Sequence, residues 1–219
     1  MEHEFWHERW ERDQITFHQR ETNPLLMKYW PSLAVSAGRG VLVPLCGKSL
    51  DMRWLEAQGH QVWGVEISRK AIDAYFAEAG EEAQFVQGTN IHAYAGAGTK
   101  IYFGDYLQLS RPDVPRVGGV FDRGALVALP TAQRAQYADH IQRIIPNNAT
   151  ILLVTIEYDQ NKVSGPPFSV PEAEVQTLYG ERCRVELLER APAAGLPPRF
   201  SDAGVNDVQQ CVYRIVKER

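Results

Sequence analysis

Residues 40–68, GVLVPLCGKSLDMRWLEAQGHQVWGVEIS, contain two short apolar runs separated by an amphipathic segment. The runs at residues 40–45 and 61–67 are typical of buried β-strands, with Pro44 near the end of the first, where its missing N–H is tolerated. Between them, residues 49–58 place their large apolar side chains on one side of a helix. This order of strand, helix and strand favours a parallel sheet covered by helices.

The same alternation continues along the chain and predicts one α/β domain over residues 1–219, with a doubly wound, mostly parallel sheet. Residues 1–35 form an N-terminal helical extension expected to lie over this domain. Two late β-rich runs, 183–189 and 208–216, are expected to pair antiparallel and close one edge of the sheet, so that one strand at that edge is antiparallel. The other expected elements are helices over 25–33, 68–79, 131–145 and 171–179, strands over 100–103, 119–121 and 150–157, and a hairpin or flexible loop over 88–98.

Composition excludes several classes of protein. The 219 residues include 23 Lys and Arg against 27 Asp and Glu, a net charge of −4, which argues against nucleic-acid binding. The apolar runs are too short to span a membrane, and the charged start lacks the apolar region of a signal peptide. Three widely spaced cysteines, an odd number with no metal-ligand spacing, predict reduced thiols and no metal site. We therefore expect a soluble, cytoplasmic, monomeric protein.

Polar residues and glycines follow four of the predicted strands, at the edge where parallel sheets of this class bind ligands. These residues are Gly47, Glu66, Asp105 with Tyr106, and Arg123. Residues 44–49 lack the first glycine of a phosphate-binding loop and the three glycines of the dinucleotide fingerprint. A nucleoside without phosphates fits a turn with a single glycine better.

Glu66 follows Gly47 at the spacing where an acidic side chain accepts hydrogen bonds from both ribose hydroxyls. These features predict S-adenosylmethionine, an adenosine that carries a sulfonium cation, as the ligand. Aromatic rings of the extension, those of Trp6, Trp10 and Phe17, are candidates to close over this cation. Each feature also has a simpler interpretation: a tight turn at the glycine, a solvated carboxylate, a surface salt bridge of the arginine, and an amphipathic helix that only packs on the core.

The chain resembles the thiopurine S-methyltransferases in their bacterial form. The resemblance is carried by residues 41–68, by FDRGALVALP at 121–130, by GPPFSVP at 165–171 and by the opening at 6–19, and it extends over the whole chain. It implies a class I methyltransferase fold with a seven-stranded sheet and S-adenosylmethionine as donor, which becomes S-adenosylhomocysteine. By this resemblance the cofactor-binding residues are Trp6, Trp10, Leu45, Gly47, Glu66, Asp105, Tyr106 and Arg123, and the substrate side is formed by Phe17 and Arg199.

The implied reaction is methyl transfer to the sulfur of an aromatic or heterocyclic thiol such as a thiopurine, with selenium and tellurium species as further candidates in detoxification. Arg123 and Arg199 would act electrostatically on the anionic sulfur, so no strong general base is required. Cys46, next to Gly47, is interpreted as a buried structural thiol. Two alternatives remain open: an NAD-linked oxidoreductase, and a non-enzymatic protein that binds thiols or metalloids.

Overall fold

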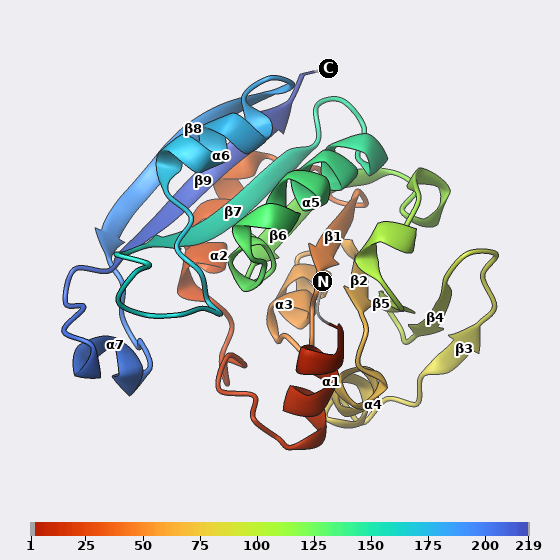
Figure 1. The fold of residues 1–219 in the computed structure, drawn as a ribbon. Coiled ribbons are helices and arrows are strands. Elements are labelled where there is room, and N and C mark those ends of the chain that lie inside the picture. The colour runs from red at the N-terminus through yellow and green to blue at the C-terminus, as the bar shows by residue number, and fades with distance from the viewer. Residues whose placement is uncertain (1–2, 219) are drawn as a thin grey trace.

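A nine-stranded sheet forms the centre of the protein in the computed structural model, which describes residues 3–218. The strands follow the order β3-β4-β5-β2-β1-β6-β7-β9-β8, and the five central ones, from β5 to β7, are mutually parallel (Figure 1). The strands are β1 Gly40–Pro44, β2 Gln61–Glu66, β3 Gln84–Val86, β4 His92–Ala95, β5 Thr99–Phe103, β6 Val117–Arg123, β7 Thr150–Glu157, β8 Cys183–Pro192 and β9 Gln209–Lys217.

Helices cover both faces of this sheet, so that its central strands are buried on two sides. In β1, Val41 and Val43 pack into the cluster that contains α2, α3 and α4, while Leu42 packs into the cluster that contains α5 and α6. Successive side chains of a strand point to opposite faces, which explains why the run is apolar throughout. The helices are α1 His3–Glu11, α2 Pro24–Tyr29, α3 Asp51–Ala57, α4 Arg69–Ala77, α5 Thr131–Ile144, α6 Glu172–Tyr179 and α7 Pro198–Asp202.

The expectation of a seven-stranded sheet was wrong, because β3 and β4 add a hairpin beside β5. Phe85 of this hairpin is 55% exposed, and its ring packs against those of Tyr94 and His92 on the paired strand. Such short strands at a sheet edge carry no continuous apolar run, so only the hairpin alternative for residues 88–98 pointed to them. The expected antiparallel strand at the other edge is β9, but it lies between β7 and β8, and β8 forms the edge itself.

The N-terminal extension wraps around the end of the sheet where β1 and β2 finish. Its first helix, α1, lies beside α4 (Figure 1). The expected helix over residues 25–33 divides into α2 and a 3₁₀ turn, Trp30–Leu33, because Pro31 lacks the N–H that would continue the α-helix. Met1, Glu2 and Arg219, which the predicted domain and extension include, lie outside the described residues.

Asp122, at the end of β6, is a buried carboxylate that should make the stability of the protein depend on pH. It accepts hydrogen bonds from the Tyr137 hydroxyl at 2.7 Å and the Leu126 N–H at 3.1 Å, and burial raises its pKa from 3.8 to about 6. The folded protein therefore holds a proton that the unfolded chain releases. Its contribution to stability is fully present below pH 3.8 and is lost as the pH rises through about 6.

Asp122→Asn removes this titration and is expected to reduce the loss of stability between acidic and neutral pH. Between acidic pH and pH 7, the wild type should lose about 3 kcal/mol more of its free energy of unfolding than the variant does, since one pKa unit corresponds to about 1.4 kcal/mol. Urea unfolding at a series of pH values measures it. Burial also raises the pKa values of Asp51 and Glu66, so the test is the divergence of the two curves. Parallel curves would contradict the prediction.

Candidate functional site

Glu66 and Gly47 meet at the ends of β1 and β2. Because the two strands are parallel neighbours, with Pro44 paired to Val65, the residues that follow them lie side by side. The Gly47 N–H donates to Glu66 Oε2 at 2.8 Å, and the Ser68 N–H donates to Oε1 at 2.7 Å. Glu66 is 6% exposed, and burial raises its pKa. The carboxylate is thus fixed by backbone donors, and each oxygen keeps a lone pair for a further partner.

The turn after β1 brings the backbone of Gly47 close to the N-terminal extension. Leu45 and Gly47 have φ angles of +47° and +52°, in the left-handed region. A Cβ atom added to Gly47 would lie 3.0 Å from Cζ2 of Trp10, whose side chain is buried. Glycine is therefore favoured here by the close approach of the indole ring as well as by the backbone conformation.

Three predicted aromatic residues form one cluster over this turn. The Phe17 ring lies between Trp6 and Trp10, with centroid distances of 5.5 and 5.7 Å and edge-to-face geometry in both pairs. Arg123 reaches the same cluster, because its Nη1 donates to the Phe17 carbonyl at 3.3 Å. The predicted residues from the extension and from β6 are thus brought together.

Arg123 does not pair with its neighbour Asp122, which excludes the simpler interpretation of a surface salt bridge between them. Asp122 is directed into the core toward Tyr137, while Arg123 points toward the extension. Burial lowers the pKa of Arg123, and the charge of nearby Asp51 partly opposes this effect. Arg123 is therefore a half-buried cation at the site.

Polar contacts fasten the extension over the site. Lys70 Nζ of α4 lies 3.0 Å from Asp13 Oδ1 and 3.1 Å from the Glu11 carbonyl oxygen. At the start of α1, His3 Nε2 lies 3.1 Å from Asp105 Oδ2. Asp105 also accepts the Leu107 N–H at 2.8 Å through Oδ1. Asp105 therefore lies at the site, where it contacts α1 and orders the turn after β5.

Tyr106 is not brought to the site, although it was predicted to bind the cofactor. Its side chain is 1% exposed and lies in the core, with ring centroids 4.8 Å from Tyr137 and 4.9 Å from His140. The 3₁₀ turn Tyr106–Gln108 directs the ring under α5 instead. A ring enclosed in this way has no free face for a ligand.

A cleft opens between α1 and the loops that follow β6 and β7. It encloses about 130 Å³, and its lining is apolar: Phe5, Trp6, Ala128, Pro130, Gly165, Pro166 and Phe168. Of these residues only Trp6 was a predicted site residue. Gly165, Pro166 and Phe168 lie in the GPPFSVP segment at residues 165–171, and Ala128 and Pro130 lie in FDRGALVALP at 121–130. Both segments carry the resemblance described above, but these five residues were assigned no role.

Arg199 does not share a contact with Arg123, although both were predicted to act on the same sulfur atom. It is exposed on α7, and its Nη2 donates to the carbonyl of Pro166, a residue that lines the cleft. Arg199 therefore does not line the cleft itself, but contacts the backbone of a residue that does.

The remaining reactive side chains are buried or scattered. Cys46, Cys183 and Cys211 are buried and free, and burial raises the pKa of the Cys46 thiol, which makes it a poor nucleophile. Among residues 3–218, no group of three or more His, Cys, Asp or Glu side chains has the arrangement of metal ligands.

None of the helices described for this chain has the length and apolar character needed to cross a membrane.

Comparison with known proteins gives a consistent result over the whole chain. The family model described as Thiopurine S-methyltransferase (TPMT) matches residues 1–218. A thiopurine S-methyltransferase of Pseudomonas fluorescens is 46% identical over 215 residues, which cover 98% of this chain and 99% of that protein. One from Nitrosospira multiformis is 42% identical over 216 residues, with 99% and 98% covered.

Solved structures show the same fold at low sequence identity. A 1,6-didemethyltoxoflavin-N1-methyltransferase of Burkholderia thailandensis, with bound substrate and S-adenosylhomocysteine, has a TM-score of 0.67 at 15% identity, covering 99% of this chain and 87% of that one. An S-adenosylmethionine-dependent methyltransferase of Anabaena variabilis has a TM-score of 0.66 at 11% identity, with 99% and 95% covered. The sheet and its helices are therefore those of this class of methyltransferase.

Proposed function

The chain belongs to the thiopurine S-methyltransferase family, and from this premise we propose that it methylates the sulfur of thiopurines with S-adenosylmethionine as donor. The single observation that carries the proposal is the buried Glu66 carboxylate at the end of β2, bonded to the Gly47 N–H beneath Trp10. Family membership and this geometry support the same cofactor. We assign no role to NAD, because the three glycines of its binding fingerprint are missing.

The residues around Glu66 fit an adenosyl sulfonium. The carboxylate oxygens are fixed by backbone donors and can accept hydrogen bonds from two ribose hydroxyls, and no side chain separates the Gly47 backbone from Trp10. The rings of Trp6, Trp10 and Phe17 supply the aromatic faces that favour a cation. When bound, S-adenosylmethionine supplies an electrophilic methyl group that an acceptor sulfur takes by direct displacement.

The apolar cleft beside Trp6 is the proposed site of the thiol acceptor. Its aromatic and proline lining suits a flat heterocycle. Its volume of about 130 Å³ is below the ~300 Å³ of the smallest ordinary ligand pockets. We therefore propose that α1 acts as a lid, which moves to admit ligands and whose contacts to α4 and Asp105 hold it in place.

Arg123 is the residue proposed to act on the acceptor. A half-buried guanidinium favours the thiolate over the thiol, because its charge is screened less by water there than on the open surface. Heteroaromatic thiols ionise readily, so that this electrostatic effect replaces a general base. Arg199 is proposed to act more indirectly, by holding the Pro166 carbonyl at the wall of the cleft.

The proposal is tested by mass spectrometry of the products formed with S-adenosylmethionine and a panel of acceptors: thiopurines, thiophenols, catechols and selenite. Methylated thiopurine is expected, and S-adenosylhomocysteine, but not NAD, should raise the melting temperature. A protein that binds S-adenosylhomocysteine and methylates no member of the panel would instead favour a binding function. The selenite arm tests the further proposal of metalloid detoxification.

A cytoplasmic location and a monomeric state belong to the same proposal. The free, buried cysteines suit a reducing compartment. Positive and negative charges are mixed, with a net charge of −4, which is compatible with a soluble monomer.

A further inference from the structure

Arg134, in the first turns of α5, is a buried cation that the proposed reaction does not use. Its side chain is 1% exposed, whereas arginines are almost never fully buried unless they are paired. A buried ion pair contributes little net stability, because desolvation of both charges offsets their attraction. The burial of this guanidinium is therefore better explained by the backbone and side-chain groups that it hydrogen-bonds than by a gain in stability.

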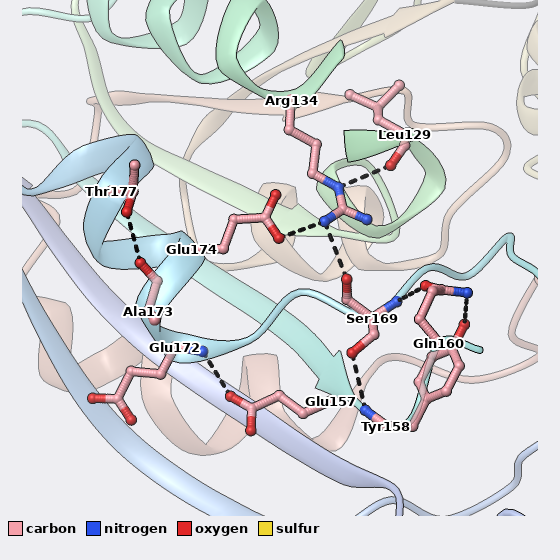
Figure 2. Close-up of polar contacts among 10 residues, drawn as sticks. All are labelled: Leu129, Arg134, Glu157, Tyr158, Gln160, Ser169, Glu172, Ala173, Glu174 and Thr177. Carbon is pink, nitrogen blue, oxygen red and sulfur yellow. Dashed lines mark hydrogen bonds and ion pairs between the residues drawn. The ribbon is translucent and has the colours of Figure 1, made fainter. Parts of the chain in front are cut away.

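The guanidinium joins three segments of the chain (Figure 2). Its Nε donates to the Leu129 carbonyl at 2.9 Å, and its Nη1 donates to the Ser169 carbonyl at 3.1 Å and to Glu174 Oε2 at 2.7 Å. The loop after β6, the segment before α6 and α6 itself thus meet at one side chain. Only the planar fork of arginine can serve these three acceptors together.

The segment held at Ser169 is also the wall of the acceptor cleft. Gly165, Pro166 and Phe168 line the cleft, and the Phe168 ring centroid lies 5.9 Å from the Arg134 Cζ. The Phe168 N–H donates to the Val127 carbonyl at 2.6 Å, which joins this segment to the loop that Arg134 contacts at Leu129. A shift of the Ser169 backbone would therefore carry the Phe168 ring with it.

A second side chain, that of Gln160, contacts the backbone of the same residue at its N–H group. Gln160 Oε1 accepts the Ser169 N–H at 2.7 Å, and the Ser169 hydroxyl oxygen accepts the Tyr158 N–H at 3.0 Å (Figure 2). Ser169 is thus held between Arg134 and Gln160.

We propose that Arg134 is a positioning residue that sets the place of the Phe168 wall and thereby the affinity and size selectivity for the thiol acceptor. The inference rests on the proposed function for the identity of the acceptor. Arg134 touches neither acceptor nor cofactor site. Loss of its bond to Ser169 should loosen the cleft while the Glu66 and Gly47 site remains intact.

Arg134→Lys tests this proposal, because it keeps a cation for Glu174 but cannot span Leu129 and Ser169 as well. The expected result is an acceptor KM raised about tenfold for a two-ring thiopurine and raised less for a one-ring thiophenol, since misplaced contacts cost the larger ligand more. The KM for S-adenosylmethionine should change less than about twofold, because its residues are not displaced. Calorimetric titration of 6-mercaptopurine into protein saturated with S-adenosylhomocysteine gives a readout that is independent of turnover.

Two matched variants separate positioning from general loss of stability. Glu174→Gln removes the charge of the ion pair but keeps a side-chain oxygen that can accept the Arg134 hydrogen bond. The affinity for the thiol substrate should therefore remain near the wild-type value. Gln142→Leu removes another buried link between α5 and α6, in which Gln142 Nε2 donates to Ala138 and Leu178 carbonyls at 2.8 and 3.1 Å. It should lower the melting temperature without changing the ratio of two-ring to one-ring KM.

Gln160→Ala keeps the proposal testable if Arg134→Lys does not fold, because it releases the same Ser169 backbone and should raise the two-ring KM in the same way. The proposal is overturned if Gln142→Leu shifts the ratio of two-ring to one-ring KM as much as Arg134→Lys and Gln160→Ala do. It is also overturned if neither Arg134→Lys nor Gln160→Ala shifts this ratio. Wild-type protein that binds the thiopurine without methylating it would refute the proposed function and leave the affinity comparison valid. Wild-type protein that binds no thiopurine would overturn both.

Discussion

Glu66→Ala is expected to raise the dissociation constant for S-adenosylhomocysteine at least about tenfold, because a hydrogen bond to a charged group contributes roughly 1.5–3 kcal/mol. The carboxylate is buried and fixed by the Gly47 and Ser68 N–H groups. Its removal takes away the proposed partner of the ribose hydroxyls and leaves two backbone donors without their acceptor. Isothermal titration calorimetry measures the change directly.

The control for this experiment is Glu78→Ala. Glu78 directly follows α4, and its half-exposed carboxylate pairs with Lys48. Its affinity for S-adenosylhomocysteine should equal that of the wild type. Melting temperatures of both variants show whether the folded state persists. If a folded Glu66→Ala protein binds with unchanged affinity, Glu66 is not the residue that binds the ribose.

Arg123→Ala should reduce kcat for thiopurine methylation by about 100-fold, the usual effect of removing one electrostatic group that acts in the transition state. The guanidinium is proposed to stabilise the thiolate, so the acid limb of the pH–rate profile should move to higher pH in the variant. The dissociation constant for S-adenosylhomocysteine should change much less than kcat. Steady-state kinetics across pH, with calorimetric binding of S-adenosylhomocysteine, distinguish these effects.

Arg143→Ala provides the matched control, since this arginine is exposed on α5. Within residues 3–218 its one ion pair is with Asp139, one helical turn earlier. Its kinetics should be those of the wild type. Full activity of Arg123→Ala with thiol acceptors would reject the electrostatic role. An equal loss of kcat and of affinity for S-adenosylhomocysteine would make Arg123 a cofactor-binding residue only.

The sequence determined the central strands and the core of the site because both depend on local patterns. An apolar run such as residues 40–45 is buried on two faces in any parallel sheet, and parallel neighbours end at the same edge. Gly47 and Glu66 therefore had to lie close together, as their 2.8 Å contact shows. The helix expected over residues 68–79 is α4, and the Ser68 hydroxyl caps its start by accepting the Ala71 N–H.

Tertiary structure alone decided which way the less regular residues point. Tyr106 follows a strand just as Arg123 does, yet its ring turns under α5, whereas Arg123 reaches the extension. The direction of a side chain after a strand depends on the packing of segments far away in the chain, which no local period encodes. The β3–β4 hairpin is too short and too exposed for a clear alternation. The sequence therefore offered a hairpin only as one of two alternatives for residues 88–98, and the pairing with β5 decided between them.

Arg134 shows the same division most clearly. In the sequence it is one charged residue of an amphipathic helix, and the ordinary expectation for it is a solvated position. Its burial arises because Leu129, Ser169 and Glu174, up to 40 residues away, converge on it only after α5 and α6 pack on one face of the sheet. Local patterns determined the sheet and the carboxylate at its edge, while long-range packing decided the cleft wall and the residues that hold it, since those contacts have no sequence period.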